Sequence, residues 1–481
     1  MKHHIAADGL APDETSQPPG CSTLSDPTYA AASTAAGFAP RRSRDDLLQL
    51  AHYHRMLETL GHVSGTAAGG IIGKERVVAW HHLDEPSFQH TWKLGRDAKQ
   101  SPLERYDHEF AFRIDVLKAA AAGAPIVEPV ATAECESCPW VGDCWPKIEA
   151  ADSTSLLPRY GYKQWHALRR RGITSRAQLA GLDERTAYLL GKVPGLPALV
   201  AEADGADPSA TLTDLESCPA AAQVVILAEH GVHTAADLAR LDRKVLVLAD
   251  APGLGLVDAI RGARVITGGG RAVLRWGVEV LEVPGAEVEI DIDMENAIDG
   301  THYLWGALVD GHYHAFASWD QPSSTVDSDV FIKFWTWLQH QRTAAQNSRR
   351  SLIAYCWSRG AEAGALRRGA VAAEAAGHPG VVDAVDEFLD GDELIDLLAV
   401  FRDQVVTGQG SGLKVVAPLA GFAWRDDDPG GEASMLWHQQ AIGAEASPER
   451  AEARQRLLDY NEDDVRATAA IRHWMRSGTI V

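Results

Sequence analysis

The sequence contains little of what marks a membrane protein, a secreted protein or a disulfide-stapled fold. No apolar run approaches the roughly 18 residues that a membrane-spanning helix requires. The opening residues, Met1-Lys2-His3-His4, are followed by no apolar segment of the kind that forms a secretory signal. Six cysteines are too few to staple a chain of 481 residues. We therefore expect a cytoplasmic protein that has no membrane partner.

Positive charge is also scarce. The chain has 45 Lys and Arg against 66 Asp and Glu, which gives a formal net charge of −21. This balance argues against a protein that coats nucleic acid over its whole surface, but it permits a local basic face or a site where carboxylates hold metal ions. The remaining composition is ordinary for a globular protein, and the length predicts about three domains.

The pattern along the chain predicts an α/β multidomain fold. Residues 1–40, rich in Ala, Ser, Thr and Pro, are expected to form loops, followed by a helix from residue 45, a strand–turn–strand over 68–80 and a helix over 102–121. Further on, strands are expected at 288–294, 303–308, 312–318 and 351–355, and helices at 328–346, 362–374, 392–403 and 448–476. Strands followed by alternating strands and helices predict a mixed sheet with flanking helices.

An internal repeat occupies residues 151–275. Residues 172–183 and 231–242 are identical at six of twelve positions, and Pro194-Gly195-Leu196 recurs as Pro252-Gly253-Leu254. Each unit is predicted to be helix, Gly turn, helix, with Ser175 or Thr234 as the cap and the leucines 179, 182, 238 and 241 facing inward. The units resemble helix-hairpin-helix modules, which contact nucleic-acid backbone; the alternative is a helical spacer.

The charge of the repeat separates its two units. Residues 151–200 have eight Lys and Arg against three Asp and Glu, whereas residues 201–260 have three against ten. We therefore expect Arg169, Arg170 and Arg171 in the first unit to contact nucleic-acid phosphates. The second unit is expected to be a packing partner.

Carboxylates gather in two places near the C-terminal end. Asp291, Asp293 and Glu295 are spaced by two on one predicted strand, so they project from one face. Tyr460 and Asp464 are four apart on the last predicted helix and share a helix face. Crowded carboxylates repel one another unless a divalent cation such as Mg²⁺ or Mn²⁺ binds them. The alternative for the strand is a solvated sheet face.

These residues resemble the first and last motifs of DEDD exonucleases with an RNase H-like fold, in Asp293-Met294-Glu295 and Tyr460-x-x-x-Asp464. The segments VEIDIDMEN and YNEDDVRAT, with Ser411-Gly412-Leu413-Lys414 and Gly421-Phe422-Ala423-Trp424 between them, resemble a bacterial group of RecB-like putative nucleases with a C-terminal YprB-like ribonuclease H domain. The resemblance runs over nearly all of the chain and implies a 3′→5′ exonuclease.

The resemblance also implies roles for individual residues. Asp293 would bind or bridge two divalent ions, Mg²⁺ or Mn²⁺, and Glu295, Glu362 and Asp464 would complete the metal shell. Tyr460 would orient the attacking water, because a phenol is a poor general base at neutral pH. Glu362 stands where the family's second motif has an acid, often Asp; alternatively, it is an ordinary acid in the first turn of a helix.

The N-terminal part resembles a fragment of a RecB-type nuclease of the PD-(D/E)xK class. Gln49 and Tyr53 form the Q-x-x-x-Y pattern of the helix that follows the catalytic core in that class, although alone they are also ordinary helix neighbours. Lys2 matches the lysine of the D/E-x-K motif, but no acid pair precedes Gln49. Either the start codon is misassigned or this domain is a catalytically dead remnant.

Three of the six cysteines lie within ten residues, as Cys135-x2-Cys138-x5-Cys144. Such clustering in a protein without disulfides indicates a metal, either zinc or an iron–sulfur cluster. The spacing resembles the trio that ligates a [4Fe–4S] cluster in iron–sulfur RecB-type nucleases. Cys21 is the available upstream fourth ligand, in an unusual position for it.

Together these features predict three domains and one leading function. The domains are a partial RecB-like nuclease with the cysteine cluster (1–150), tandem helix-hairpin-helix-like repeats (151–275) and an RNase H-like exonuclease (276–481). The leading function is a metal-dependent nuclease acting on DNA or RNA. The alternative is a nucleic-acid-binding or scaffold protein in which both nuclease folds have decayed.

Overall fold

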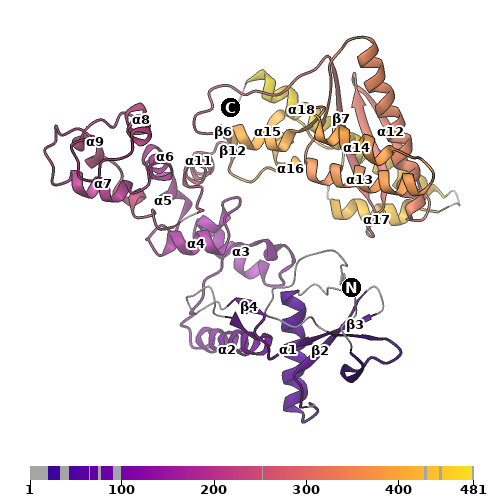
Figure 1. The fold of residues 1–481 in the computed structure, drawn as a ribbon, viewed down its shortest axis with the longest axis horizontal. Helices are drawn as coiled ribbons and strands as arrows, with labels where there is room; N and C mark the ends of the chain where they lie inside the picture. The colour runs from indigo at the N-terminus through magenta and orange to yellow at the C-terminus, as the bar shows by residue number, and fades with distance from the viewer. Residues whose placement is uncertain are drawn as a thin grey trace. The chain divides into compact units, whose positions relative to one another are not determined.

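The computed structural model describes residues 20–32, 43–63, 65–73, 77–89, 99–251, 253–426, 431–443 and 447–478 (Figure 1). The chain divides into two compact units, 1–128 and 129–481, each described here by itself. Lys2 lies outside the described residues. In the described parts of both units, every helix is too short or too polar to cross a membrane.

The first unit contains a small antiparallel sheet and two helices. The strands are β1 (Cys21–Thr23), β2 (Ala68–Ile72) and β3 (Val77–His82), in the order β1-β3-β2. The helices are α1 (Arg44–Thr59) and α2 (Pro102–Ala121), and a two-stranded ribbon joins β4 (Phe88–Gln89) to β5 (Lys99–Gln100). The side chains of Ser43 and Ser101 cap the two helices by accepting backbone N–H bonds. The predicted helices and the two predicted strands are confirmed, whereas β1 lies in a stretch that was expected to form loops.

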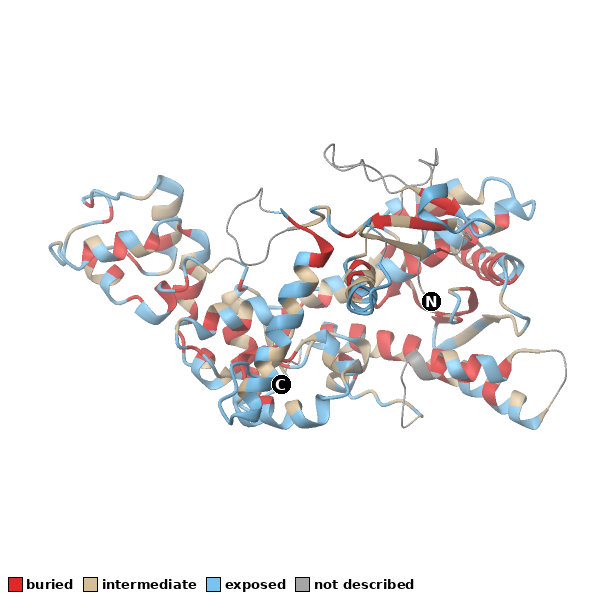
Figure 2. Ribbon diagram, turned by 90° about the horizontal axis from the view of Figure 1, so that it is seen from below, coloured by how far each residue is buried: buried red, intermediate tan, exposed pale blue. Residues whose placement is uncertain are grey.

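The second unit begins with short helices that contain the repeat. They are α3 (Val141–Ala150), α4 (Tyr162–Arg169), α5 (Arg176–Ala180), α6 (Glu184–Lys192), α7 (Leu196–Ala203), α8 (Ala221–Glu229), α9 (Ala235–Ala239), α10 (Arg243–Leu246) and α11 (Leu256–Thr267). Ser175 and Thr234 cap α5 and α9 as predicted. The four repeat leucines are buried, which gives each unit an apolar interior. Figure 2 shows that the helices carry both buried and exposed residues.

A five-stranded mixed sheet follows, in the order β11-β10-β7-β8-β9. Its strands are β7 (Val288–Asn296), β8 (His302–Val309), β9 (His312–Ala317), β10 (Leu352–Cys356) and β11 (Leu394–Asp396). β10 runs parallel to both β7 and β11, whereas β7, β8 and β9 are joined as an antiparallel meander. The predicted mixed sheet is confirmed.

Helices complete this part of the second unit. They are α12 (Ser324–Asn347), α13 (Arg359–Ala375), α14 (Val381–Asp390), α15 (Leu397–Gln404), α16 (Leu413–Val416), α17 (Gly431–Ala441) and α18 (Pro448–Ser477). A short antiparallel ribbon pairs β6 (Ala272–Leu274) with β12 (Val405–Thr407).

The two faces of β7 differ in polarity, and this difference places the helices. Ile290 and Ile292 are fully buried on one face, where Trp305 of β8 stacks on Phe334 of α12 with ring centroids 4.5 Å apart. The opposite face carries the acidic residues and faces α18, whose Arg472 and Asn461 bond to Asp291 and Asp293. Strand alternation therefore sends the apolar side chains to the core and the acids to the last helix.

One predicted helix is wrong in part. Residues 392–403 do not form a single helix, because Leu394–Asp396 pairs with β10 as the edge strand β11 and α15 begins only at Leu397. The Asp396 side chain accepts a hydrogen bond from the Ala399 backbone N–H, which starts the helix after the strand. The helices α14 and α17 were not predicted from the sequence.

Candidate active site

Three carboxylates from two elements meet beside the sheet. Asp293 and Glu295 lie on β7, and Asp464 lies in the middle of α18. One oxygen of each lies within 4.8 Å of the others, a separation at which the three could share a metal ion. Glu295 and Asp464 are buried, and Asp293 is partly exposed. Three of the residues predicted for the catalytic site are thus brought together by segments that lie far apart in the sequence.

Two polar neighbours orient the strand carboxylates. The Asn461 side-chain amide donates to Asp293 Oδ2 at 2.8 Å, and Ser434 Oγ of α17 donates to Glu295 Oε2 at 3.1 Å. Asn461 accepts in turn from the Tyr313 hydroxyl at 2.8 Å. The close approach of Asn461 requires a glycine opposite Asp293 on β8, because a Cβ at Gly306 would lie 1.8 Å from Asn461 Oδ1. Gly306 therefore makes room for the residue that holds Asp293.

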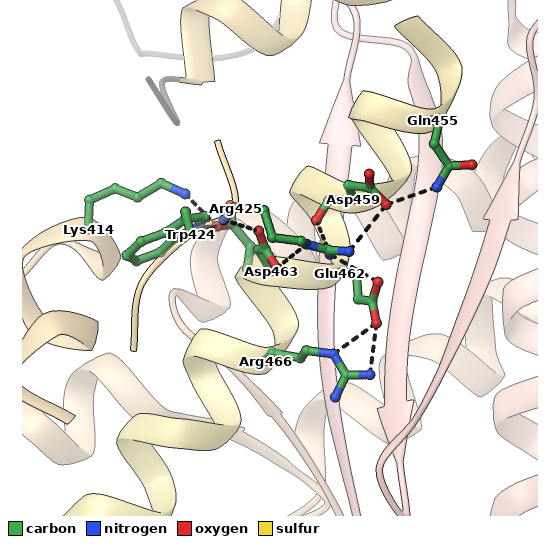
Figure 3. A network of polar contacts seen from close by, with 9 residues as sticks. Lys414, Trp424, Arg425, Gln455, Asp459, Glu462, Asp463 and Arg466 are labelled. Carbon is green, nitrogen blue, oxygen red and sulfur yellow. Dashed lines mark hydrogen bonds and ion pairs between the residues drawn. The ribbon is translucent and has the colours of Figure 1, made fainter. Parts of the chain in front are cut away.

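A lysine and two aromatic rings surround Asp464. Lys414 Nζ of α16 lies 2.5 Å from Asp464 Oδ1, and Trp424 Nε1 donates to the same oxygen at 2.6 Å. The ammonium group also lies 4.0 Å from the Trp424 ring centroid and 4.5 Å from that of Tyr460. Cation–π contact with two rings fixes the ammonium group beside the carboxylate. Figure 3 shows Lys414 extending along the Trp424 ring.

Arg425 fastens the loop that carries Trp424 to α18. Its backbone N–H and its Nε donate to the two oxygens of buried Asp463, both at 2.9 Å. Its Nη2 donates to both the Asp459 carbonyl at 2.7 Å and Glu462 Oε2 at 3.0 Å. Figure 3 shows the guanidinium group among these acids of α18. Because the anchor is one residue after Trp424, it holds the indole against Asp464.

The electrostatics of the cluster favour a positive ligand. Burial and the charge of Asp464 raise the pKa of Glu295 to about 8, against the opposing effects of Ser434 and Lys414. Burial, then the charges of Asp464 and Glu295, raise the pKa of Asp293 well above its usual range. The pKa of Asp464 is also raised by burial, although Lys414 opposes it. A bound cation would let all three carboxylates ionise.

Glu362 lies in the first turn of α13 and is buried beside this cluster. Its charge is among those that raise the pKa of Asp293, and burial together with the charge of Asp396 raises its own pKa to about 7. Its Oε2 has no hydrogen-bond partner among the described residues. Glu362 does not belong to the group of three whose oxygens lie within 4.8 Å. A buried carboxylate oxygen without a partner is costly unless it meets a cation, which fits a ligand more closely than an ordinary helix-terminus acid.

Tyr460 lies one helical turn before Asp464 and points to the same carboxylates. Its hydroxyl hydrogen-bonds to Asp464, and its ring is mostly buried. Burial, followed by the charges of Asp464 and Glu295, raises the pKa of the phenol above its usual range. The phenol therefore remains protonated at neutral pH.

Asp291 shares the acidic face of β7 but is neutralised. Arg472 of α18 bonds to Asp291 Oδ2 at 2.7 Å and also contacts Glu289. Arg476 lies 2.6 Å from Glu289 Oε1. Burial still raises the pKa of Asp291 to about 6 despite Arg472. Asp291 therefore forms a structural ion pair with Arg472 and does not belong to the three clustered carboxylates.

The other predicted site residues are placed as follows. Gln49 donates to the Tyr53 hydroxyl at 2.7 Å on α1, in an exposed position of the first unit. Arg171 bonds to the Val247 and Ala167 carbonyls and to Asp250, so it ties α4 to the second unit of the repeat. Arg169 and Arg170 are exposed, and the Arg169 guanidinium lies 5.4 Å from the Trp165 ring centroid.

The cysteine trio is not gathered into a metal site. Cys135, Cys138 and Cys144 are free thiols near the start of the second unit, and among the described residues their sulfurs do not form a group close enough to share an ion. Cys21 is buried on β1 of the first unit. No structural observation supports a [4Fe–4S] cluster or a zinc site at the trio, and its metal role stays a prediction.

Sequence reasoning missed four residues that contact the cluster. Lys414 and Trp424 were noted only as parts of resembling segments, and Ser434 was not noted. Asn461 lies inside the YNEDDVRAT segment, where its position three residues before Asp464 places it on the same helix face. That spacing was the available signal for Asn461. Nothing local in the sequence distinguishes Ser434.

A family model of the RNase_H superfamily matches residues 375–476. The matched segment begins at the end of α13 and continues into α18, so it contains Lys414, Tyr460 and Asp464 but not β7. No curated protein and no solved structure matches the chain. The match supports an RNase H-like C-terminal domain and indicates a nuclease that hydrolyses nucleic acid.

Proposed function

We propose that the chain is a metal-dependent nuclease whose active centre is formed by Asp293, Glu295 and Asp464. The observation that carries the proposal is the approach of these three carboxylates, from β7 and α18, to within 4.8 Å beside Lys414. Three ionised carboxylates at this separation repel one another, and a bound cation removes that repulsion. The RNase_H superfamily match of the segment containing Asp464 supports the same class of reaction.

The donor set fits Mg²⁺ or Mn²⁺, which prefer carboxylate oxygens and water. Asp293 would be the shared ligand, and Glu295, Glu362 and Asp464 would provide the others. The unpartnered Oε2 of Glu362 is available for this purpose. Two bound ions would stabilise the attacking and leaving oxygens of the phosphodiester.

The remaining contacts support proposed roles for individual protein groups. Asn461 and Ser434 fix the orientation of Asp293 and Glu295 through hydrogen bonds. The protonated Tyr460 hydroxyl would orient the attacking water, since its raised pKa makes it a poor base. Lys414 would attract the substrate phosphate to the carboxylate end of α18.

The finer features of the proposal come from the sequence resemblance. These are 3′→5′ polarity, a two-metal mechanism and kinship with RecB-like nucleases that have a YprB-like domain. The proposed domains remain a partial RecB-like domain over 1–150, helix-hairpin-helix-like repeats over 151–275 and the exonuclease over 276–481. Arg169, Arg170 and Arg171 remain proposed phosphate contacts of the repeat, and Gln49 and Tyr53 remain proposed remnants of the RecB-like motif.

The decisive experiment incubates the full chain with end-labelled single- and double-stranded DNA and RNA. Mg²⁺ or Mn²⁺ is added, and EDTA serves as the blank. We expect metal-dependent hydrolysis, with shortening from the 3′ end visible when the label is at the 5′ end. Asp293→Asn should abolish hydrolysis while preserving the fold, because it removes a charge without changing the shape of the side chain.

The matched control is Asp310→Asn in the turn between β8 and β9. This change also removes one carboxylate charge from the sheet, but at an exposed position. Full hydrolytic activity in Asp310→Asn together with loss of hydrolysis in Asp293→Asn would support the proposed active centre. Equal activity of both variants would refute it. Absence of hydrolysis of all four substrates by the unmodified chain would instead favour the non-catalytic binding or scaffold protein.

A metal role of Cys135, Cys138 and Cys144 remains a prediction from their spacing. Anaerobic purification followed by iron, acid-labile sulfide and zinc analysis tests it directly. Loss of iron and sulfide in Cys138→Ser would support the iron–sulfur prediction, and stoichiometric zinc without sulfide would support the zinc alternative. Metal-free protein would refute both for this chain.

A further inference from the structure

A cavity of about 540 Å³ lies within the second unit, where α11 meets α15 and β12. It is lined by parts of four segments: the loop before α4, the start of α11, Arg275 directly after β6, and the stretch from Phe401 to Ser411. No part of the carboxylate cluster lines it. The cavity is therefore a second concave site, and neither the catalytic proposal nor the predicted phosphate contacts on α4 use it.

Positive charge predominates in this cavity. Its charged lining residues are Arg159, Arg275, Arg402 and Asp258. Asp258 is paired with Arg275 at 3.2 Å, which leaves Arg159 and Arg402 without a lining acid. The pKa of Arg402 is lowered by burial and by the charge of Arg159, so the two guanidinium groups repel each other. A basic cavity is unusual in a chain of net charge −21 and calls for an anionic ligand.

Some hydrogen-bond donors around the cavity have no acceptor among the described residues. Arg275 Nε is buried without a hydrogen-bond partner among the described residues. Gly255 precedes α11 with φ +53°, and no side chain caps that helix. The first N–H groups of a helix attract anions when no cap occupies them. A buried guanidinium nitrogen and an uncapped twelve-residue helix thus lie around the same space.

Arg159 is held in an unfavourable backbone conformation at the cavity. Its φ of +64° lies in the left-handed region, which costs a non-glycine residue about 1–2 kcal/mol. A glycine or asparagine would adopt this conformation more easily. The arginine at this position therefore contributes something other than backbone stability.

The cavity is connected to the carboxylate cluster by a short piece of chain. Arg402 Nε donates to Ser411 Oγ at 2.7 Å, and Ser411 is three residues before Lys414, which contacts Asp464. Three residues span at most about 11 Å. A polynucleotide strand whose scissile bond lies at Asp464 would therefore have neighbouring phosphates within reach of the cavity.

We propose that the cavity lined by Arg159, Arg275 and Arg402 binds a backbone phosphate of the nucleic-acid strand on which the carboxylate cluster acts. This inference rests on the proposed nuclease function, because it takes the substrate to be a polynucleotide. Arginine suits the role, since its planar group can donate two parallel hydrogen bonds to phosphate oxygens. The cavity thus holds the strand while the carboxylates meet the bond to be cleaved.

The test measures binding of a fluorescent single-stranded oligonucleotide by anisotropy in EDTA over a salt series. Arg159→Asn removes the charge and keeps a residue that tolerates the backbone. We expect severalfold weaker binding at low salt, and a plot of log K against log salt flatter by about 0.7 for the lost phosphate contact. Arg159→Lys should recover most of the slope, and Arg275→Gln should also weaken binding. Arg240→Gln is the matched control, an exposed arginine outside the cavity, and should bind normally.

Three outcomes decide the inference. Unchanged affinity and slope in both Arg159→Asn and Arg275→Gln would overturn it, whether or not the chain hydrolyses nucleic acid. Weaker binding in these variants supports it, even if the unmodified chain shows no hydrolysis and the nuclease proposal fails. In a competition arm, inorganic phosphate and a mononucleotide replace the oligonucleotide. Tight arginine-dependent binding of these probes without oligonucleotide binding would overturn the backbone-phosphate assignment in favour of a small phosphorylated ligand.

Discussion

Replacing Glu295 by Gln should change the stability of the sheet in opposite directions with and without metal. In the metal-free protein the pKa of Glu295 is raised to about 8 from an ordinary value of 4.5. A raised carboxyl pKa means that the folded state binds a proton that the unfolded state has released. The free energy of unfolding therefore falls as pH rises from about 4.5 to about 8. The amide side chain of Glu295→Gln cannot ionise, so the variant loses this dependence.

The magnitude follows from the width of that window. Each pH unit costs the folded state about 1.4 kcal/mol for one such group. Between pH 5.5 and 7.5 the free energy of unfolding should therefore fall by about 3 kcal/mol more in the unmodified protein than in Glu295→Gln. In EDTA at pH 7.5 the variant should be the more stable of the two. In saturating Mn²⁺ the order should reverse, because the cation stabilises the ionised Glu295 and binds the variant less tightly.

The assay is hydrogen exchange of β7 and β8 peptides in a urea series, corrected for the intrinsic pH dependence of exchange. This assay measures the stability of the sheet separately from that of the first unit and of the repeat. Asp310→Asn, which removes an exposed carboxylate, should follow the unmodified protein at both pH values. If the difference between Glu295→Gln and the unmodified chain were equal at pH 5.5 and 7.5 in EDTA, the electrostatic reasoning would be wrong.

Three further predictions test the contacts around the cluster. Lys414→Met should bind Mn²⁺ more tightly in calorimetry, because the ammonium group 2.5 Å from Asp464 competes with the ion; weaker binding would mean that Lys414 supports the metal. Gly306→Ala should cost about 1–3 kcal/mol in urea unfolding, since its methyl group would overlap Asn461, and unchanged stability would show that Asn461 has other room. Arg472→Gln should cost about 3–5 kcal/mol, because it leaves buried Asp291 without its partner, and a cost below about 1 kcal/mol would contradict the buried ion pair.

Local spacing was sufficient to predict the faces on which the acids lie. Period-two acids on a strand and a Tyr–Asp pair four apart on a helix define two faces, whatever the rest of the fold does. The mixed sheet followed from the alternation of strands and helices. The sequence pattern did not predict the edge strand β11, because Leu394–Asp396 is short and adjoins a helix. Its pairing with β10 is a tertiary effect.

The sequence could not distinguish the acids that are neutralised from those that are not. Asp291 and Asp293 have equivalent positions on β7, but Arg472 reaches only the first of them. The difference depends on where α18 crosses the sheet, which spacing within β7 does not determine. The same limit applies to Lys414 and Ser434, whose contacts with Asp464 and Glu295 span 50 and 139 residues of sequence.

The arrangement of charge along the interface of β7 and α18 explains why one end forms internal ion pairs, whereas the other end is the proposed metal site. At one end, Glu289 and Asp291 meet Arg472 and Arg476, so two negative charges face two positive ones. At the other end, Lys414 is the one cationic side chain that Asp293, Glu295 and Asp464 meet within the described part of the chain. Including Glu362, four carboxylates face one ammonium group, which leaves three negative charges when all are ionised. Two divalent cations and one substrate phosphodiester would together bring three positive charges. The proposed two-metal complex therefore restores at the second end the neutrality that the arginines give to the first, and metal-free protein can reach it only by taking up protons.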